Sequence, residues 1–468
     1  MAARSVEMLS YLLANFLESL FKRIDDELVP KFYPVSFEMS KDHIQMSFHS
    51  SQVSIPTSIP EIKHLFERKS YLKDLIETYI GKSFYENSGL FFSDFFLYDQ
   101  SIFTYAFSFD RKILDSYYRM TETAGVREKS IIDAIISETQ HYLSQCSINF
   151  INNREIPQRS IDDLLKDAGK VLLSSILDND TVDNPFDKIC KISSLSYEKA
   201  FSNGRILLMS PESIESIEEN PDFKLLLTFH VQIPLSSYRH IRKILELSKE
   251  DVLLLSDGEY IYSIIQFNNT DYHLDPSKHY FIVEFNSYYS WQLNHNANKL
   301  MQVTHEEVFI PKPKISYFGF SSEFKRVFEG IETKRILNLY KIILEASNQV
   351  KGTIIVISRN ARSEAFRLKN QGFIINPTVL NATTVKSITS IDGAVLVDTD
   401  GVCHGIGVIL DGVATEKGDP SRGARYNSAI RYVETIANNQ NYSDCLTIVI
   451  SEDGDVDIIS KYSLRISY

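Results

Sequence analysis

The sequence predicts an α/β domain with a central sheet over residues 321–468, preceded by a mainly helical region and by a mixed α+β region. Two patterns carry the prediction for the C-terminal part. Apolar runs typical of buried strands occupy residues 352–357, 394–397, 407–410 and 446–450. Helical patterns occupy residues 324–346, 383–388 and 424–437. Strands that mingle with helices in this way are typical of a sheet with helices packed on it.

The first region, residues 1–175, is expected to have a regulatory or oligomerisation role. Its predicted helices lie near residues 4–27, 60–80, 128–145 and 160–175, and the stretch from Val35 to Phe48 could form strands. The first helix is amphipathic and carries Glu18 and Lys22 among its apolar residues, which argues against a signal peptide or a membrane span. Membrane association by this helix is the minor alternative.

The second region, residues 186–315, is predicted to be mixed α+β. Its strand candidates lie at 225–233, 252–255, 260–267 and 280–285, with a short helix at 238–247. An acidic segment that ends in Pro185 is the best candidate linker before this region, and Pro311-Lys312-Pro313 is expected to mark a boundary after it.

Composition excludes some classes of function. The chain of 468 residues is 43% apolar and 24% charged, as globular proteins are. Its net charge of −12 argues against non-specific binding to nucleic acid or to an anionic membrane, because both require a basic surface. A nucleotide site stays compatible with this charge, because helix N-termini and a few Arg residues can build one. Four cysteines without a CxxC pair predict no zinc site or disulfide framework and favour a reducing cytoplasm.

Three short motifs in the C-terminal region could carry chemistry. Asp392-Gly393-Ala394 precedes a buried strand, Gly423-Ala424-Arg425 begins a helix, and Ser451-Glu452 ends a strand. A helix N-terminus suits a phosphate, and carboxylates can hold a divalent cation or activate a hydroxyl group. Taken singly, each motif also has a plain interpretation, as a turn, as a loop with a surface Arg or as a hairpin.

In their order and context, the motifs resemble the diadenylate cyclase family. The family pattern is a strand near a Gly, an Asp-Gly-Ala motif, a strand pair, a Gly-Thr/Ala-Arg-His-Arg motif at a helix start, and a strand that ends in Ser-Glu. The resemblance implies a central mixed sheet flanked by helices. It also implies that two ATP molecules condense into cyclic di-AMP, each 3′-hydroxyl attacking the α-phosphate of the other ATP while pyrophosphate leaves.

The same resemblance implies roles for individual residues. Asp392 and Glu452 would be the catalytic and metal-binding residues, with Mg²⁺ or Mn²⁺ as the cofactor. The nucleotide- and phosphate-binding residues would be Gly393, Ala394, Gly423, Ala424, Arg425, Tyr426, Asn427 and Ser451. Because one domain binds one ATP, a homo-oligomer with its cyclase domains face to face is implied, and no nucleic acid partner is expected.

The chain departs from the family at one point. The family's Arg-His-Arg reads Arg425-Tyr426-Asn427, so the second and third side chains can donate hydrogen bonds but bring no positive charge. Charge-assisted hydrogen bonds are roughly twice as strong as neutral ones. Phosphate binding could therefore be weaker, or the preferred nucleotide could differ.

Residues 236–267, and the block from His279 to Pro311, resemble the sensor region that precedes the cyclase domain in a divergent branch of the family. A packing domain that holds a cyclase dimer together is an equal alternative, and the sensor's ligand or protein partner stays open. His404 follows the Asp-Gly-Ala strand and could approach the site, although a lone His is more often structural. Two hypotheses result: a cyclase regulated by its N-terminal regions, and a nucleotide or cyclic-dinucleotide sensor that has lost turnover. A cyclase that makes another dinucleotide is a third, weaker hypothesis.

Overall fold

The computed structural model divides the chain into two compact units, residues 1–312 and 313–468. The division falls inside the Pro311-Lys312-Pro313 segment. The structure describes residues 2–40, 42–48, 51–59, 61–81, 88–114, 116–120, 125–177, 184–197, 200–201, 203–249, 251–268, 279–296, 298–312, 314–315, 317–347, 351–412, 423–438, 444–451 and 456–462. The first and second predicted regions share one unit, so the division into three domains stays a proposal.

The N-terminal part of the first unit combines helices with a six-stranded antiparallel sheet. The strands are β1 (Lys31–Ser40), β2 (His43–Phe48), β3 (Ser51–Pro56), β4 (Ser88–Phe92), β5 (Phe96–Tyr98) and β6 (Ser101–Asp110). The helices are α1 (Ala2–Ile24), α2 (Ile62–Phe66), α3 (Lys69–Ile76), η1 (Glu77–Gly81), α5 (Arg111–Leu114), α6 (Ile131–Ile151) and α7 (Ile161–Leu177). The prediction of a mainly helical region named the long helices and missed most of this sheet.

Helix α1 belongs to the core of the first unit. Leu9, Leu13, Leu17 and Leu20 recur at helical spacing, are buried, and pack with aromatic residues of β6 such as Phe107. This packing explains the amphipathic pattern without a membrane. Among the described residues, no helix is both long enough and apolar enough to cross a bilayer.

The rest of the first unit is built on an eight-stranded sheet of order β10-β12-β11-β9-β13-β14-β15-β16. Its strands are β9 (Gly204–Leu208), β10 (Phe223–Pro234), β11 (Val252–Ser256), β12 (Tyr260–Phe267), β13 (Phe281–Ser287), β14 (Ser290–His295), β15 (Asn298–Thr304) and β16 (Glu307–Phe309). The remaining elements are α8 (Pro185–Ser193), β7 (Ser196–Tyr197), β8 (Ala200–Phe201), α9 (Pro211–Glu215), η3 (Ile217–Glu219) and α10 (Tyr238–Leu245). The predicted strands, hairpin and helix of this region are present.

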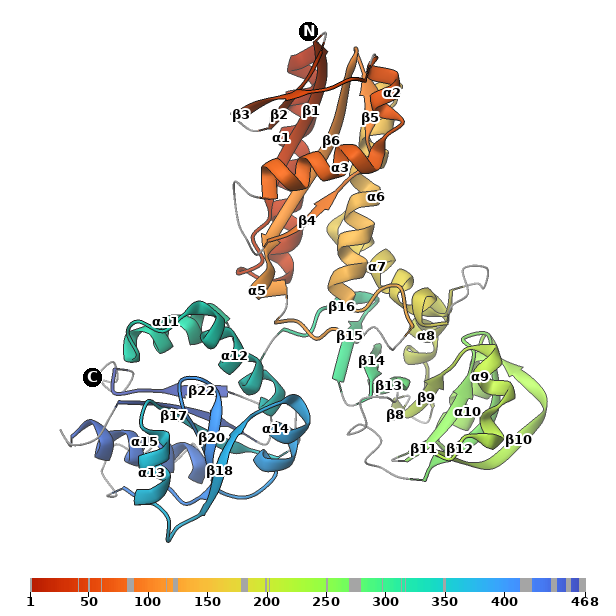
Figure 1. The fold of residues 1–468 in the computed structure, drawn as a ribbon. Helices are drawn as coiled ribbons and strands as arrows, with labels where there is room; N and C mark the ends of the chain where they lie inside the picture. Colours follow the sequence, from red (N-terminus) through yellow and green to blue (C-terminus); the bar gives the residue numbers. More distant parts are fainter. Residues whose placement is uncertain are drawn as a thin grey trace. The chain divides into compact units, whose positions relative to one another are not determined.

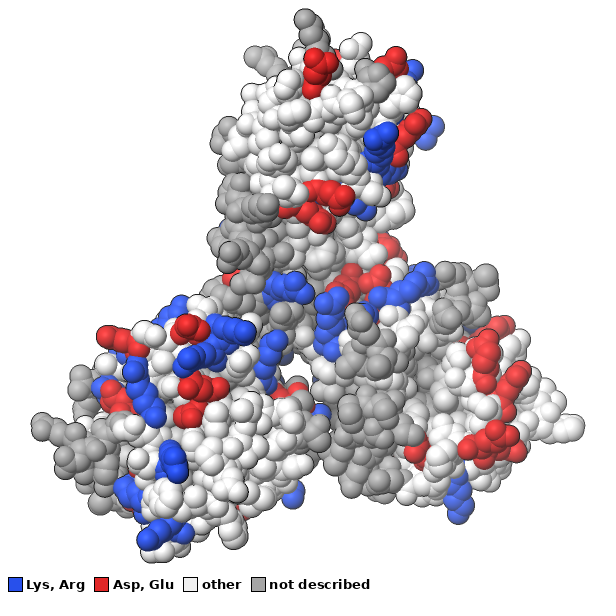
Figure 2. All heavy atoms as spheres, in the orientation of Figure 1, with Lys and Arg blue, Asp and Glu red and all other residues white. Residues whose placement is uncertain are grey.

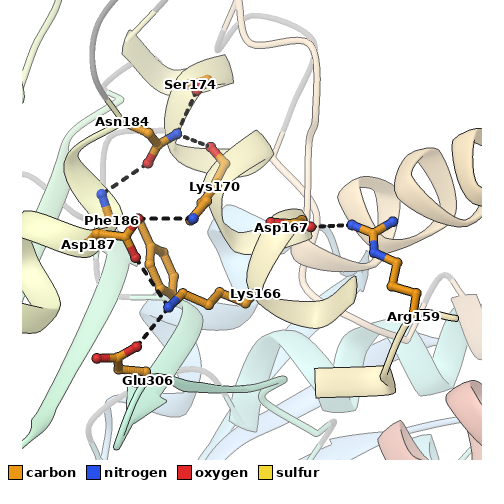
Figure 3. Close-up of polar contacts among 9 residues, drawn as sticks. All are labelled: Arg159, Lys166, Asp167, Lys170, Ser174, Asn184, Phe186, Asp187 and Glu306. Carbon is orange, nitrogen blue, oxygen red and sulfur yellow. Dashed lines mark hydrogen bonds and ion pairs between the residues drawn. The ribbon is translucent and has the colours of Figure 1, made fainter. Parts of the chain in front are cut away.

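Polar contacts join α7 to this second part (Figure 3). Lys166 contacts Asp187 of α8 at 3.2 Å and Glu306, next to β16, at 2.7 Å. Lys170 contacts the other oxygen of Asp187 at 3.0 Å. Asn184 caps α8 and donates to the carbonyl oxygen of Lys170. These contacts tie the helical and mixed parts into one unit, although partly exposed ion pairs add only about 1 kcal/mol each or less.

The second unit is an α/β domain with one six-stranded mixed sheet (Figure 1). The strand order is β18-β20-β19-β17-β21-β22, and β17 and β19 are parallel while the other pairs are antiparallel. The strands are β17 (Thr353–Ser358), β18 (Phe373–Val379), β19 (Ala394–Val397), β20 (Val402–Val408), β21 (Cys445–Ile450) and β22 (Val456–Ile459). The helices are α11 (Tyr317–Val327), α12 (Thr333–Ser347), α13 (Ala361–Arg367), α14 (Ala382–Thr389) and α15 (Ala424–Ala437).

Alternation along the central strands explains the layers of this domain. Ile355 and Ile357 of β17 face a core formed with α11, α12 and α14. Ile354 and Val356 face the other core, formed with α13 and α15. Both faces of the strand are therefore apolar, which is why it reads as a continuous apolar run. The predicted helix over residues 324–346 is in fact two helices, interrupted where Gly330 has a positive φ of 77°.

Charge on the second unit is mixed. On the face that Figure 2 shows, its Lys and Arg residues are interspersed with Asp and Glu residues. This face thus offers no continuous basic surface among the described residues, in keeping with the net charge of the chain.

Candidate functional site

Strand pairing brings two of the three motifs to one edge of the sheet of the second unit. Ile354 of β17 lies opposite Ala394 of β19, and Thr353 lies opposite Ile450 of β21. The start of β19 and the end of β21 therefore flank the start of β17. Asp392 lies two residues before β19 and Ser451 directly follows β21, so both lie at this edge, separated by two strand spacings of about 5 Å each. We call this edge, with Asp392, Gly393 and Ser451, the motif edge.

The third motif reaches the motif edge from α15. Nη2 of Arg425 lies 3.8 Å from Oδ1 of Asp392. The Asp392 side chain is 97% exposed and that of Arg425 is 35% exposed. An ion pair this long and this exposed contributes little to stability. Both charged groups therefore stand at the surface, where a ligand can replace the contact between them.

Gly423 occupies the N-cap of α15 and leaves the start of the helix open. Its φ of −65° is accessible to any residue, and a Cβ added there would meet no atom of the described residues within 4 Å. The first turn contains no acidic residue. The partial positive charge of the helix N-terminus is thus uncompensated by a neighbouring carboxylate on the helix, and the backbone can be approached closely.

Gly393 has a different role from Gly423. Its φ is 106°, and a Cβ there would lie 2.5 Å from the carbonyl carbon of Gly407 and 2.8 Å from the nitrogen of Val408. The turn before β19 and its close approach to β20 both require glycine. Ala394, the third residue of this motif, is fully buried, so its side chain belongs to the core.

The two residues that depart from the family pattern take part in the structure of α15. Tyr426 is partly buried and packs against the core beneath α15. Nδ2 of Asn427 donates to the carbonyl oxygen of Gly423 at 3.3 Å and so supports the first helical turn. Arg425 is the basic residue that this turn brings to Asp392. Ser451 is partly buried at the motif edge, and Glu452 lies outside the described residues.

His404 lies at the opposite edge of the sheet from Asp392. It neighbours Cys403, which pairs with Val397 at the far end of β19. Its Nε2 lies 2.8 Å from Oδ2 of Asp398, whose Oδ1 accepts hydrogen bonds from the N–H groups of Asp400 and Val402. The pair organises the turn between β19 and β20. The idea that His404 approaches the site is therefore wrong.

An apolar surface next to Asp392 was missed by the sequence analysis. Phe373, Ile391 and Ile409 are 67%, 41% and 68% exposed. Ile391 and Phe373 both approach Gly407, at 3.3 and 3.6 Å from the position that a Cβ would take there. Ile409 follows the end of β20, and its N–H group donates a hydrogen bond of 2.8 Å to the carbonyl oxygen of Gln371, two residues before Phe373. We call these three residues the apolar surface. Because they come from three separate segments of the chain, no local sequence pattern predicts it.

Two protein-family models match the chain. Residues 342–464 match the DAC model, described as DisA bacterial checkpoint controller nucleotide-binding, and all three motifs lie inside the match. Residues 183–297 match the DACNH model, described as a probable sensor domain. The chain carries a DACNH domain followed by a DAC domain. DAC is the diadenylate cyclase domain, so the fold expected for the C-terminal region is confirmed.

Solved structures are also similar to parts of this chain. One is a hypothetical membrane spanning protein from Bacillus cereus, with 23% identity and a TM-score of 0.25 over 31% of this chain and 68% of that one. Another is a double cysteine mutant of DacA from Staphylococcus aureus, with 18% identity and a TM-score of 0.22 over 28% of this chain and 89% of that one. No curated protein matches the chain significantly.

Proposed function

We propose that this protein is a diadenylate cyclase that converts two ATP molecules into cyclic di-AMP and two pyrophosphates. The observation that carries the proposal is the convergence of Asp392, Ser451 and the start of α15 at the motif edge of the DAC domain. In each half of the reaction, a 3′-oxygen forms a bond to the α-phosphorus of the other ATP. The bond from that phosphorus to the bridging oxygen of pyrophosphate breaks, and the hydroxyl proton is released.

The described residues support a division of roles at this edge. Asp392 is an exposed carboxylate and would accept or orient the proton of the 3′-hydroxyl group. Arg425 and the N–H groups at the start of α15 would hold phosphate oxygens and stabilise the charge that develops on them. Gly423 would let a phosphate approach the backbone. Ser451 and Glu452 would lie beside phosphate and metal, as the family resemblance implies.

The site suits a divalent cation that is bound together with phosphates. The described residues contain no group of three or more His, Cys, Asp and Glu side chains able to hold a metal alone. Mg²⁺ in nucleotide sites needs only one or two carboxylates, since phosphates and waters supply the remaining ligands. Asp392 fits this requirement, and Glu452 would be the second carboxylate. When bound, Mg²⁺ or Mn²⁺ would neutralise phosphate charge.

The reaction requires a second copy of the DAC domain. One domain presents one motif edge, whereas each ATP must attack the other. The apolar surface beside Asp392 supports face-to-face assembly, because exposed apolar side chains around a polar site are typical of an interface. We therefore propose a homo-oligomer that works in the cytoplasm, where ATP is available, with the DACNH domain and the N-terminal residues as regulators. The four cysteines are buried and free, which suits a reducing compartment.

One observation favours a second candidate function. Tyr426 packs on the core and Asn427 supports the helix turn, so neither replaces the charge of the family's His and second Arg. A DAC domain with one arginine in this turn could bind a nucleotide or a cyclic dinucleotide without turnover. The chain would then be a sensor.

Product analysis separates the two functions. The purified full chain is incubated with ATP and either Mg²⁺ or Mn²⁺, and cyclic di-AMP is measured by mass spectrometry. We expect product from the native chain and none from Asp392→Asn. The matched control is Asp400→Asn, which changes a half-exposed Asp at the opposite edge of the same sheet and should leave product formation unchanged. ATP binding without product in either metal would establish the sensor instead.

A further inference from the structure

A partly buried polar network lies beside the motif edge and connects α13, α15 and the residues that follow β20. Arg367 ends α13 and binds the carboxylate of Asp411 through both terminal nitrogens, one of them at 2.8 Å. Its Nε donates to Oε2 of Glu364 at 2.9 Å. Glu364 in turn accepts a hydrogen bond of 2.7 Å from the hydroxyl group of Tyr432 on α15. The chain of contacts therefore runs from Asp411, after β20, through α13 to α15.

Charge strengthens this network, and burial does so at its Tyr432 end, whereas the side chains of Arg367 and Asp411 are 24% and 32% exposed. Tyr432 is fully buried and Glu364 is 9% exposed. Hydrogen bonds to Asp411 and Glu364 raise the pKa of Arg367, and the hydrogen bonds from Arg367 lower the pKa of Asp411. Burial raises the pKa of Tyr432, and Cys445 and the Glu364 carboxylate raise it further. Asp411 therefore stays ionised and the Tyr432 phenol stays protonated, so their contacts persist over the physiological pH range.

The network contacts the chain on both sides of residues 413–422, at Asp411 before them and at Tyr432 of α15 after them. Asp411 follows β20, whose Val408 pairs with Ala394 beside Asp392. Residues 413–422 then lead to Gly423 and α15. Gly412 packs directly on α15, since a Cβ there would lie 2.8 Å from the backbone of Arg431. Tyr432 is eight residues beyond the start of α15, about two helical turns.

We propose that Arg367 is a positioning residue for the nucleotide site. It fixes α15 relative to β20, and thus sets the position of Gly423 and Arg425 relative to Asp392. This inference rests on the proposed function and deepens it, because it assigns the geometry of the phosphate site to residues outside the three motifs. The ion pair between Arg425 and Asp392, at 3.8 Å, is too long and too exposed to set that geometry itself.

The network requires arginine in particular. Arg367 contacts two carboxylates with a planar fork of donors, whereas the ammonium group of lysine is a single point. Arg367→Lys keeps the charge and loses the fork. A displacement of about 1 Å at a reacting group can cost on the order of 100-fold in rate.

The test compares Arg367→Lys with Arg335→Lys in the full chain. Arg335 also pairs with an Asp, Asp400, but at the edge of the sheet opposite to Asp392. Cyclic di-AMP formation gives kcat and KM for ATP, calorimetric titration with ATP in Ca²⁺ gives Kd, and thermal unfolding gives Tm. A second variant, Tyr432→Phe, keeps the ring and removes only the donor to Glu364, so it remains informative if Arg367→Lys fails to fold.

If Arg367 has a positioning role, Arg367→Lys should raise KM and Kd for ATP about tenfold or more, measured at a temperature well below the Tm of the variant. Tyr432→Phe should shift both in the same direction by less, and Arg335→Lys should shift neither. A purely structural role predicts a lower Tm and a lower active fraction with KM and Kd unchanged, which would overturn the inference. If the native chain binds ATP without turnover, the proposed function fails and Kd alone decides the role of Arg367. If the native chain does not bind ATP, both proposals are overturned.

Discussion

Gly393 and Gly423 both belong to motifs of the DAC domain, but the backbone itself needs only the first of them. Gly393 combines a positive φ with a contact too close for a Cβ, while Gly423 has an ordinary φ and no close contact for a Cβ among the residues that the structure describes. A sequence pattern presents the two glycines as equivalent. The structure separates a glycine required for folding from one that leaves room for a ligand.

Two alanine substitutions test this difference. Gly393→Ala should destabilise the DAC domain by about 2 kcal/mol or more, because the positive φ is strained and the added Cβ meets the backbone of Gly407. Gly423→Ala should cost less than about 1 kcal/mol, the usual penalty of alanine at an N-cap. Urea unfolding measures both. Equal destabilisation by Gly423→Ala and Gly393→Ala would contradict the claim that the surface before α15 is open.

The buried His295 of the DACNH domain should make the stability of the first unit depend on pH. Burial, together with the neighbouring His279, lowers the pKa of His295 to about 4, and its Nδ1 lies 2.6 Å from the hydroxyl group of Tyr118. The unfolded chain takes up this proton near pH 6.5, and the folded chain does so only near pH 4. Stability should therefore be full above pH 6.5 and fall by up to about 3 kcal/mol as the pH drops to 4.

Urea titration at several pH values between 7 and 4 measures the free energy of unfolding of the first unit. His295→Asn should reduce the loss of stability on acidification, whereas the control His43→Asn should leave it as it is. Equal acid dependence of the native chain and of His295→Asn would rule out a neutral, buried His295.

At the scale of elements, buried strands were the most predictable part of the fold. Strand β17 was evident because both of its faces are buried, which removes the alternation and leaves an apolar run. The place of β17 between β19 and β21 joins segments far apart in the chain and follows from no local pattern. The apolar surface and the contact of Arg367 with Asp411 could not be predicted for the same reason, because each joins residues from separate segments of the chain. The motif residues were found because each is local to one turn.

Helix α1 allows a matched test of its packing. Leu17 is fully buried in the core, whereas Leu12, on the same helix, is 51% exposed. Leu17→Ala should cost about 2–5 kcal/mol, because it removes apolar contacts and leaves a cavity. Leu12→Ala should be nearly neutral. Denaturant unfolding that showed the same loss for both variants would mean that α1 does not pack on the core through its Leu17 face.

At the scale of the whole molecule, the chain consists of two units with separate cores. The two hydrophobic cores of the DAC sheet consist entirely of residues from the second unit. The DACNH domain and the N-terminal sheet share the other unit. We therefore expect each unit to fold independently of the other.

Production of residues 313–468 alone tests this independence. Because the described residues of its two cores all belong to this unit, the isolated DAC unit should unfold cooperatively, with a Tm close to that of one of the transitions of the full chain. Differential scanning calorimetry measures both. An isolated unit without a cooperative transition would show that its core depends on residues 1–312.

The central claim, that the DAC domain joins two ATP molecules through their 3′-hydroxyl groups, is tested most directly with a substrate analogue. Mass spectrometry should detect cyclic di-AMP when the purified full chain is given ATP with Mg²⁺ or Mn²⁺. With 3′-deoxy-ATP, which lacks the attacking group, no cyclic product should form. The account would be contradicted if ATP were bound without any cyclic di-AMP in either metal, or if Asp392→Asn formed the product as fast as the native chain.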